Sequence, residues 1–409
     1  MKDFKYIISL LLIATTSIEL KIFFLLFSLI FVSCADSVKI KNIKEGKLIP
    51  THYLAQSGEK KIHLDYETAP NPPYMQIIDD VSGSRILSFL NPYKNSIYFY
   101  DYEQGIQIGK VVYDRQGPNG IPRIAGYYIK NMDSIYLYNR PIEIAMCDSA
   151  GLIKKRISLN DNRKDAEWSR YYPQYEFCTV NPMLEVKGKL IMTGMAPFSI
   201  ADSLIHKFHF TACIDLESED IEFIHTYPEE LYGSNVNWQD PFFMQGYRAF
   251  TSTGEWLYSF PVSHDVYIAQ SDTKGYKTKY AGSNYAKTIH SIDDSRERTP
   301  DELILIHYLE QDLYTAILHD PYRSVYYRFM LPGIPNSTVK TPIKEKRIVV
   351  IIMDEQFNYM GETVIGSCEE WNWKNSFVTS EGLVIEYIDS DLDSEEEYLI
   401  MKIFTIEKL

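Results

Sequence analysis

The sequence predicts an all-β protein, a six-bladed β-propeller with long insertions between the blades, on three observations. The first is a high content of strand-forming aromatic residues, since the 409 residues include 32 tyrosines and 20 phenylalanines. The second is a single strand pattern that occurs six times along the chain. The third is a scarcity of helical periodicity, which is limited to a short stretch at residues 300–307.

Each copy of the repeated pattern begins with one or two turn residues and continues as a strand of alternating aromatic or aliphatic residues. A second strand, a turn and a third strand follow most copies. In the clearest case these are a strand at 142–146, a tight turn at 148–151 and a strand at 152–159. The six copies lie at residues 95–100, 133–138, 188–192, 254–258, 323–327 and 381–385.

A meander of about four strands is one blade of a β-propeller, because such a unit buries its faces only against neighbours around a ring. Six copies therefore predict six blades. The copies are 38 to 69 residues apart, and the longer intervals exceed a compact blade of about 50 residues. We expect the segment at 48–66 to supply a strand that closes the ring with the C-terminal blade. The alternative is a pair of β-sandwich domains, which also have closely spaced strands.

The N-terminus has the layout of an export signal. An apolar run at residues 22–33 follows Lys21 and ends at the small Ser33, directly before Cys34. This junction resembles the lipobox of bacterial lipoproteins, in which the cysteine becomes the lipidated first residue of the mature chain. The sequence departs from that pattern at Phe31, where the family usually has leucine.

We therefore expect three parts: a signal peptide at 1–33, a lipidated linker at 34–46 and a single propeller domain at 47–409. The alternative for the leader is an uncleaved anchor helix, which would place Glu19 and Lys21 in hydrocarbon at a cost of roughly 2.5 to 3.5 kcal/mol each. The expected location is the cell envelope, with the protein lipid-anchored on the periplasmic or cell-surface side of the outer membrane.

The charge and the cysteines limit the partners and the covalent chemistry. A formal net charge of −14 repels phosphate backbones and argues against nucleic-acid binding. The expected partners are the membrane, through the lipid, and a glycan, peptide or envelope protein. Four cysteines remain in the mature region and allow three disulfide pairings, with small buried thiols as the alternative; they are Cys147, Cys178, Cys213 and Cys368.

No catalytic or cofactor motif is present, so the catalytic residues are unknown and no cofactor is expected. The nine histidines are scattered, and the only close pair is His206 and His209. On the strand expected there, residues three apart point to opposite faces, so no metal site is expected.

Two predicted insertions, at residues 168–175 and 235–243, combine aromatic rings with hydrogen-bonding side chains, a combination that suits sugar rings and peptides. The alternative is that such loops are simply common in this chain, because residues 369–373 have the same composition. The predicted ligand-binding residues are Trp168, Arg170, Tyr171 and Tyr172 in the first insertion, and Trp238, Gln239 and Asp240 in the second.

A family resemblance comes from the segment at 114–121, which contains Gly117-Pro118-Asn119-Gly120, and from the strand start at 133–136. These stretches resemble an uncharacterised, DUF4221-like family of six-bladed-propeller-like lipoproteins from Bacteroidetes-type Gram-negative bacteria. The resemblance implies location and architecture only, and it carries over no activity and no functional residue.

Two classes of function follow. The first is a ligand- or partner-binding propeller on the cell envelope without enzymatic activity. The second is an envelope hydrolase or lyase with its active site at the propeller axis, where residues distant in sequence converge. Two or more carboxylates in the central pocket, or a histidine cluster with a bound ion, would favour the enzyme, whereas an apolar or arginine-free plugged axis would favour the binding module.

Overall fold

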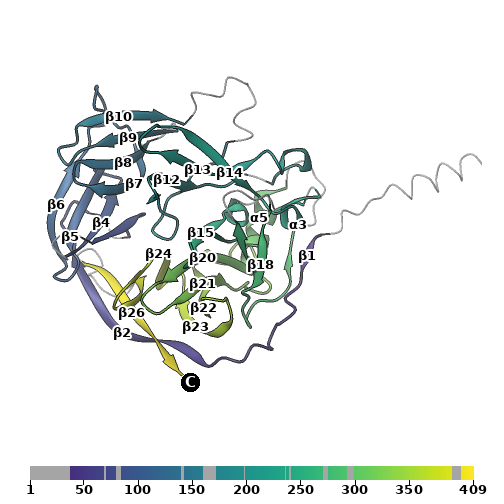
Figure 1. Ribbon diagram of the computed structural model, residues 1–409. Helices are drawn as coiled ribbons and strands as arrows, with labels where there is room; N and C mark the ends of the chain where they lie inside the picture. Colours follow the sequence, from purple (N-terminus) through teal and green to yellow (C-terminus); the bar gives the residue numbers. More distant parts are fainter. Residues whose placement is uncertain are drawn as a thin grey trace, which may run out of the picture.

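The structure is a computed structural model that describes residues 37–68, 71–79, 84–139, 142–159, 172–197, 199–234, 236–238, 241–269, 275–292, 299–388 and 398–409. Its architecture is all-β and propeller-like. The sheets stand around a common centre, and the chain passes from one sheet to the next in sequence order, as the colours of Figure 1 show.

Four of the sheets in the described part of the chain are antiparallel meanders of four strands. The first contains β3 (Met75–Asp79), β4 (Arg85–Asn91), β5 (Ser96–Asp101) and β6 (Ile106–Val112). The second contains β7 (Ile124–Asn131), β8 (Ser134–Asn139), β9 (Glu143–Cys147) and β10 (Ile153–Ser158). The third contains β11 (Leu184–Val186), β12 (Lys189–Thr193), β13 (His209–Asp215) and β14 (Ile221–Thr226). The fourth contains β15 (Tyr247–Phe250), β16 (Trp256–Ser259), β17 (Asp265–Ala269) and β18 (Lys277–Tyr280).

An eight-stranded sheet consists of two further four-stranded units. One bridge joins them, between His52 and Gly361, and a Cβ atom at Gly361 would lie only 1.8 Å from the carbonyl oxygen of His52. Only glycine allows this approach of the two backbones. The first unit contains β20 (Leu313–Asp320), β21 (Val325–Leu331), β22 (Arg347–Asp354) and β23 (Tyr359–Ser367); the second contains β24 (Trp371–Thr379), β25 (Gly382–Tyr387), β26 (Tyr398–Lys408) and β2 (His52–His63).

The last unit takes its outer strand from the N-terminal part of the chain. Strand β2 pairs antiparallel with β26 along its whole length, from His52 opposite Lys408 to His63 opposite Tyr398. This pairing confirms the expectation that a segment within residues 48–66 joins the C-terminal unit. The ring is thereby closed by hydrogen bonds between the two ends of the described chain.

The closing strand also contacts the first unit, at the turn between β5 and β6. The amide of His63 donates to the carbonyl of Gly105 at 2.9 Å. Gly105 has a φ of +67°, and a Cβ atom there would lie 2.0 Å from the carbonyl oxygen of Lys61. Glycine is therefore needed at this turn both for its backbone conformation and for its contact with β2.

Each copy of the sequence repeat coincides with a strand, but one copy occupies a different position within its unit. Five of the six copies fall on the second strand of a unit, namely on β8, β12, β16, β21 and β25. The first copy falls on β5, the third strand of its unit. The interval after the first copy is therefore the shortest of the five.

Short elements lie outside the large sheets. Within the described residues the helices are α3 (Glu229–Tyr232), α4 (Pro241–Met244) and α5 (Asp301–Glu310), and two 3₁₀ turns cover Asp202–Leu204 and Ile343–Glu345. Helix α5 confirms the only helical stretch that the sequence predicts. Strand β1 (Lys39–Ile40) pairs with β19 (Ile289–His290), and the Asn42 side chain donates to the carbonyls of Ser283 and Ala286 at 2.8 Å. Part of the expected linker at 34–46 is thus docked on the propeller-like body.

A buried arginine joins β21 to the preceding unit. Arg328 is fully buried, and its Nε donates to Ser259 Oγ at 2.9 Å. Its two terminal nitrogens donate to backbone carbonyls of that unit, including those of Ser263 at 2.8 Å and Ala281 at 3.1 Å. The guanidinium also lies 4.0 Å from the centre of the Tyr314 ring. Every nitrogen of this buried cation therefore has an acceptor.

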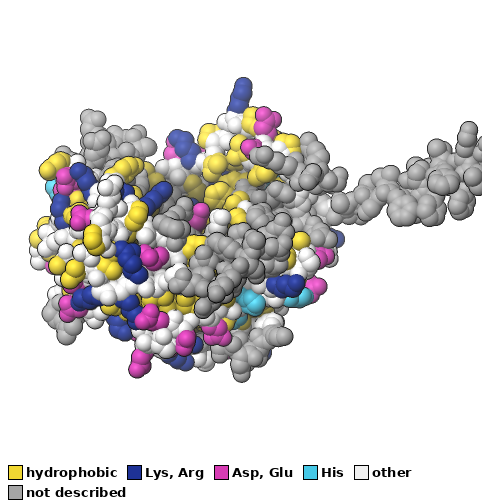
Figure 2. All heavy atoms as spheres, turned by 90° about the horizontal axis from the view of Figure 1, so that it is seen from above, with side chains coloured by type: hydrophobic (Ala, Val, Ile, Leu, Met, Phe, Trp, Pro, Cys, Tyr) yellow, Lys and Arg dark blue, Asp and Glu magenta, His cyan; other side chains and the backbone are white. Residues whose placement is uncertain are grey.

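Charges of both signs are interspersed on the outside of the molecule. Figure 2 shows lysine and arginine side chains next to aspartate and glutamate side chains over the face in view. The net charge of −14 is therefore not gathered into one acidic patch on this face.

Candidate ligand-binding site

A pocket of about 370 Å³ lies at one end of the ring axis. In Figure 1 the labelled first strands β7, β15, β20 and β24 lie nearer the ring centre than the strands β10, β18, β23 and β26 of the same units, so the first strand of a unit is its inner strand. Most residues that line the pocket lie in the segments that lead into the inner strands β3, β11, β15 and β24 or at the start of these strands, whereas Met195 follows β12. Four units therefore contribute to one cavity, and we refer to it as the axial pocket.

One wall of the axial pocket is apolar and held rigidly. Phe177 lines it and stacks on Tyr175, with ring centres 6.0 Å apart and planes within 6°. Its ring also packs directly on the backbone of β7, because a Cβ atom at Gly126 would lie 2.3 Å from it. Met195 and Phe242 extend this wall. An aromatic face fixed in this way can bind the apolar face of a ligand without losing side-chain entropy.

Two buried amides in the pocket wall leave acceptors without partners. Asn181 donates through Nδ2 to the carbonyls of Thr193 and Glu176, and Gln245 donates through Nε2 to the carbonyl of Gly246. These bonds fix which end of each amide is nitrogen. Asn181 Oδ1 and Gln245 Oε1 have no hydrogen-bond partner, although the side chains are only 1 % and 6 % exposed. Unpaired buried acceptors are costly, so they favour a ligand that brings O–H or N–H groups.

The rim of the axial pocket carries one charge of each sign. Glu176 and Lys374 are both exposed lining residues, and the ammonium of Lys374 lies 5.6 Å from the centre of the Phe242 ring. Burial raises the pKa of the nearby Cys178 thiol, and Lys374 lowers it in part. The thiol is thus kept protonated and unreactive at neutral pH.

A buried polar network holds the walls of the pocket together. Glu386 is fully buried and accepts from the side-chain amides of Asn372 at 2.7 Å and Asn375 at 2.6 Å. Asn375 also donates to the carbonyl of Pro72, and Thr179 donates to Asn375 Oδ1. Burial raises the pKa of Glu386 to about 7. Because Asn372 and Pro72 line the pocket while Glu386 does not, this carboxyl positions the wall and does not face a ligand.

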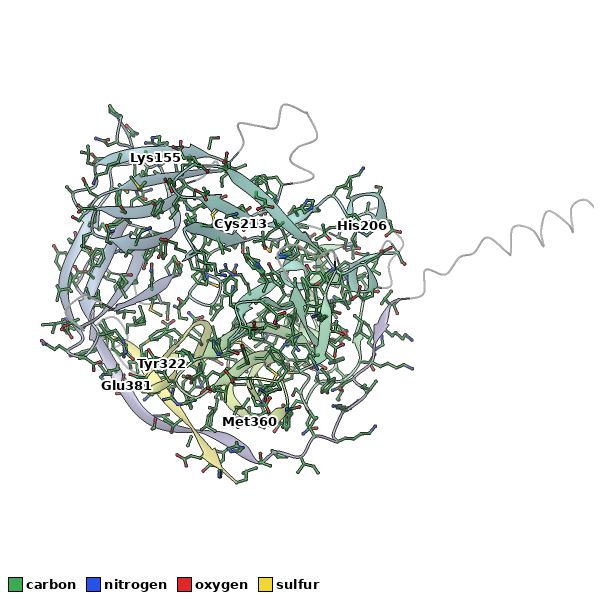
Figure 3. The ribbon with its side chains drawn as sticks, viewed as in Figure 1. Lys155, His206, Cys213, Tyr322, Met360 and Glu381 are labelled. Atoms are coloured by element: carbon green, nitrogen blue, oxygen red, sulfur yellow. The ribbon has the colours of Figure 1, made fainter. Side chains whose placement is uncertain are left out.

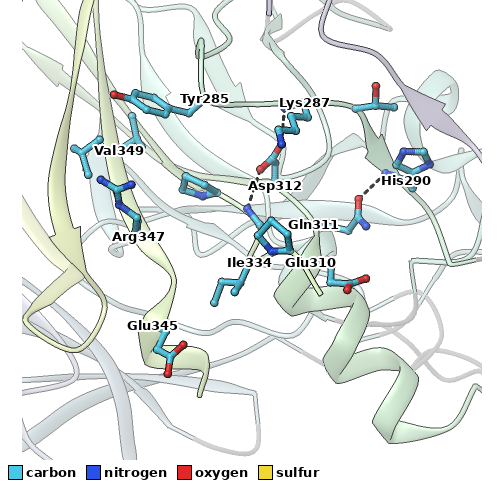
Figure 4. Close-up of a pocket in the computed structure, with 15 residues that line it drawn as sticks. Tyr285, Lys287, His290, Glu310, Gln311, Asp312, Ile334, Glu345, Arg347 and Val349 are labelled. Atoms are coloured by element: carbon cyan, nitrogen blue, oxygen red, sulfur yellow. Dashed lines mark hydrogen bonds between the residues drawn. The ribbon is translucent and has the colours of Figure 1, made fainter. Parts of the chain in front are cut away.

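A larger cavity of about 640 Å³ lies beside helix α5 (Figure 4). Two of its polar side chains, Asp312 and Gln311, already have partners. Asp312 accepts from the backbone amides of Lys287 and Gly333, and Gln311 accepts from the amide of His290. These bonds hold the loops that form the cavity, so its central polar groups are not available to a ligand.

The predicted ligand-binding residues separate into two groups. Five of them lie outside the described residues, as does the predicted lipidation site Cys34; the five are Trp168, Arg170, Tyr171, Gln239 and Asp240.

Tyr172 and Trp238 are described, and both are buried in the core. Trp238 is fully buried, donates through Nε1 to the carbonyl of Leu231 at 3.0 Å and stacks on Phe243. Tyr172 is 5 % exposed and packs edge-on against Tyr175. Their rings are therefore part of the core. Direct ligand contact by the two insertions stays a prediction.

The sequence reasoning missed the residues of the axial pocket, although it came close to them. The first insertion runs directly into Glu176 and Phe177, and the second contains Phe242. The aromatic stretch at 369–373, interpreted as a sign that such loops are common, contains Asn372. All three stretches therefore border one pocket, and the signal that could have identified it is their shared position at the start of an inner strand.

The structure describes the histidine pair His206 and His209 and the four cysteines of the mature region. His206 is exposed at the periphery of the ring (Figure 3), where its Nε2 lies 3.4 Å from Glu229. Strand β13 begins only at His209, so His206 precedes the strand on which the sequence places it. Among the residues that the structure describes, no three histidine, cysteine or acidic side chains group together as metal ligands. Cys147, Cys178, Cys213 and Cys368 are all described and all free.

No helix within the described ranges is long and apolar enough to cross a membrane.

Comparison with solved structures shows the same fold in other bacterial proteins. A member of the DUF4221 family from Bacteroides vulgatus is 20 % identical and superimposes with a TM-score of 0.72, covering 88 % of this chain and 99 % of that one. A Bacteroides fragilis protein whose name presents it as exported is 9 % identical, with a TM-score of 0.52 and coverage of 87 % and 95 %.

No curated protein sequence matches the chain. The sequence model of DUF4221, a domain of unknown function, matches residues 52–364. This match covers most of the chain, including the closing strand and the first five four-stranded units up to β23. The protein therefore belongs to the DUF4221 family.

Proposed function

We propose that this protein is a cell-envelope lipoprotein, anchored through Cys34, that binds a small polar ligand in the axial pocket. The six four-stranded units are the blades of a six-bladed propeller in this proposal. The observation that carries it is the pair of buried, unpartnered acceptors, Asn181 Oδ1 and Gln245 Oε1, beside a fixed aromatic wall. Such a site matches a ligand with an apolar face and several hydroxyl or amide groups, as sugars and peptides have.

Binding is favoured over catalysis by the chemistry of the lining. Within the described residues, Glu176 is the only carboxylate that lines the axial pocket, and no histidine lines it. Glycoside hydrolysis uses a pair of carboxylates, and the described lining of the pocket lacks histidine, the residue that most often performs general acid–base catalysis. Glu386 has a pKa near neutral, but two amides occupy its carboxyl and it does not line the pocket.

Ligand binding is tested with the full chain purified in detergent, by native mass spectrometry and calorimetry against panels of mono- and disaccharides and di- and tripeptides. Gln245→Met and Asn181→Leu remove the two acceptors, and we expect each to weaken binding of any hit at least tenfold. Gln107→Met, on the exposed side of β6, is the matched control and should leave binding unchanged. Equal affinity in the wild type and both pocket variants would refute the site, and cleavage of a bound compound would replace the binding function with an enzymatic one.

The lipid anchor is tested separately, by metabolic labelling with a palmitate analogue and mass spectrometry of the native protein. We expect label on the wild type and none on Cys34→Ala. A Cys34→Ala variant that keeps the label would exclude this anchor.

A further inference from the structure

The segment before β2 lies along the outer edge of the ring, and both of its ends are bonded to the body. Figure 1 shows it as the purple chain that leads from β1 to β2. At its start, the amide of Val38 donates to Ser291 Oγ at 2.9 Å, and the amide of Ser291 donates to the carbonyl of Val38 at 3.0 Å. At its end, the amide of Thr51 donates to the carbonyl of Met360 at 2.8 Å. We refer to residues 38–51 as the docked linker.

Side-chain hydrogen bonds hold the middle of the docked linker. The Tyr280 hydroxyl donates to Asn42 Oδ1 at 2.7 Å. The Asn284 side chain accepts from the amide of Leu48 at 2.9 Å and donates to its carbonyl at 2.8 Å. Because the backbone is bonded at its start, middle and end, the docked linker has a defined path. Its exposed side chains therefore form a fixed surface of the body.

Four exposed lysines lie on the docked linker, and none of them forms an ion pair within the described ranges. Lys44 Nζ lies 4.6 Å from the centre of the Tyr280 ring. Burial raises the pKa of the nearby Asp265, and Arg328 and Lys44 lower it in part. Glu45 is the only acidic residue of the docked linker, so this segment is cationic in a chain whose net charge is −14. The four lysines are Lys39, Lys41, Lys44 and Lys47.

The part of the body on which the docked linker lies does not neutralise these charges. Residues 275–292 contain three exposed lysines and no acidic residue. Two acidic side chains that contact this segment already hold its polar groups, since Glu362 accepts from Ser283 Oγ and Asp312 accepts from the amide of Lys287. The positive charge of the docked linker is therefore reinforced by its neighbours.

The docked linker also exposes two isoleucines between and beside its lysines. Ile43 is 70 % exposed and Ile49 is 81 % exposed. A single exposed apolar side chain is common on protein surfaces, but here both stand among unpaired lysines. Lysines that interleave with exposed apolar side chains are typical of membrane interfaces, where the cations meet anionic headgroups and the apolar groups enter the boundary with the acyl chains.

The chain between Cys34 and the docked linker is short. Val38 is the fourth residue after Cys34, and an extended chain spans at most about 3.6 Å per residue, so Cys34 lies within about 14 Å of Val38. Strand β1 lies at the outer edge of the ring in Figure 1. A lipid on Cys34 therefore brings this edge of the ring to the membrane, and not an end of the ring axis.

We propose that the docked linker is a membrane-binding surface: its four exposed lysines bind the headgroups of anionic lipids, and Ile43 and Ile49 enter the interfacial region of the bilayer. The inference rests on the membrane location in the proposed function, but not on the ligand of the axial pocket. A body held by this edge has its ring axis parallel to the membrane. The axial pocket then stays open to the surrounding solution.

The first test measures binding to vesicles by flotation, with the chain from Ala35 onward. This chain lacks the leader and the lipid but contains every residue that the structure describes, and a melting temperature equal to that of the full chain checks that it is folded. We expect it to bind vesicles with about one third phosphatidylglycerol at least tenfold more tightly than pure phosphatidylcholine vesicles. Added salt should weaken this binding, because salt screens exposed charges.

The matched variants separate the two contributions. Glutamine at all four linker lysines should lower the affinity for anionic vesicles at least thirtyfold, since each lysine near an anionic surface contributes roughly fivefold. Ile43→Ser combined with Ile49→Ser should lower it at least fivefold. The control replaces four exposed lysines outside the docked linker by glutamine and should lose less than threefold; these are Lys130, Lys154, Lys207 and Lys340.

The second test uses the lipidated full chain in the same anionic vesicles, with bromine-labelled lipid as the quencher. A tryptophan introduced by Ile49→Trp should be quenched strongly. One introduced by Tyr93→Trp should not, because Tyr93 is 75 % exposed but belongs to the first unit of the ring. This comparison reports which part of the body faces the bilayer.

The outcomes separate this surface from the lipid anchor. If Cys34 carries lipid but the lysine variant binds vesicles as the wild type does, the surface is excluded and the anchor remains. If the lysines are needed for vesicle binding while Cys34 carries no lipid, the surface stands without the anchor. Equal affinity of the unmodified chain for both kinds of vesicle, or equal quenching of the two introduced tryptophans, would overturn the proposal.

Discussion

Two arginines of this protein are buried to almost the same extent, on neighbouring units of the ring, and each lies over an aromatic ring, but their hydrogen bonding differs. Arg328 in β21 donates from all three nitrogens, to Ser259 and to several backbone carbonyls. Arg248 in β15 donates from only one nitrogen, to the carbonyl of Pro182. The same residue type therefore serves as a structural connection in one place and presents free donors in the other.

The difference shows that burial alone does not identify a functional side chain. A buried cation with all its donors satisfied contributes to fold specificity, whereas one with free donors marks a place where the protein alone is incomplete. The following predictions test whether the two arginines really differ in this way.

The largest effect is expected for Arg328→Met. Methionine fills much of the same volume but leaves the carbonyls of Ser263, Ala281 and their neighbours without donors. Removing one partner from a buried charged network costs about 3 to 5 kcal/mol, so we expect a loss of about 4 kcal/mol in the free energy of unfolding. Urea denaturation measures it, with Arg123→Met, which removes an exposed arginine, as the control. A loss of less than about 1 kcal/mol would mean that Arg328 does not hold the two units together.

Lys346 is a third buried cation, and its protonation should make the free energy of unfolding depend on pH. It donates to the carbonyls of Tyr308, Leu309 and Gln311 at the end of helix α5, and burial lowers its pKa to about 8. Below pH 8 the lysine is protonated in both states, and between pH 8 and 10.5 only the unfolded chain keeps the proton. The stability of the wild type relative to Lys346→Met should therefore rise by about 3 kcal/mol over that range. Urea unfolding at several pH values measures the difference, and a flat difference would contradict it.

A smaller effect is expected for Ser259→Ala, which removes a single acceptor from Arg328. Ser259 is fully buried, and its hydroxyl accepts from Nε at 2.9 Å. One Nε–H donor then remains unpaired, which costs about 1 to 2 kcal/mol. Thermal unfolding and urea denaturation should agree on this loss. An unchanged stability would indicate that the remaining carbonyl bonds satisfy the guanidinium without Ser259.

The smallest effect is expected for Arg248→Met. The substitution loses the bond to Pro182 but also removes a buried, uncompensated charge, so we expect the free energy of unfolding to stay within about 1 kcal/mol of the wild type. A loss as large as that of Arg328→Met would show that Arg248 has a structural role and would remove the contrast between the two residues.

The sequence predicted the fold well because local sequence patterns specify most of its strands and turns. Alternating strands, tight turns such as the one at Gly105, and the repeat itself are properties of neighbouring residues. The closing strand β2 was also predictable, as a β-like segment that no unit of the repeat accounts for. The position of the first copy within its unit was not predictable, because β4 and β5 have similar sequence patterns and only the pairing of the strands distinguishes them.

The site could be predicted only in part, because it is assembled from residues far apart in the sequence. Phe242 and Asn372 stand in stretches that the sequence marked as aromatic and polar, yet nothing local shows that both face the same cavity. Asn181 and Gln245 stand out only through missing partners, and a missing partner is a property of three-dimensional packing. Tyr172 and Trp238 have the composition of a ligand-binding loop, but their rings lie in the core.

The pairing of β2 with β26 has a consequence for how the chain reaches this structure. His52 in β2 lies opposite Lys408 in β26. Strand β2 is synthesised long before β26, so it can form this pairing only after β26 has been synthesised. Until both are present, β2 is an unpaired edge that can join other chains, and contacts so distant in sequence form slowly. The growing chain must therefore keep β2 unpaired until β26 has been synthesised, so closure of the ring depends on the segment that forms β26.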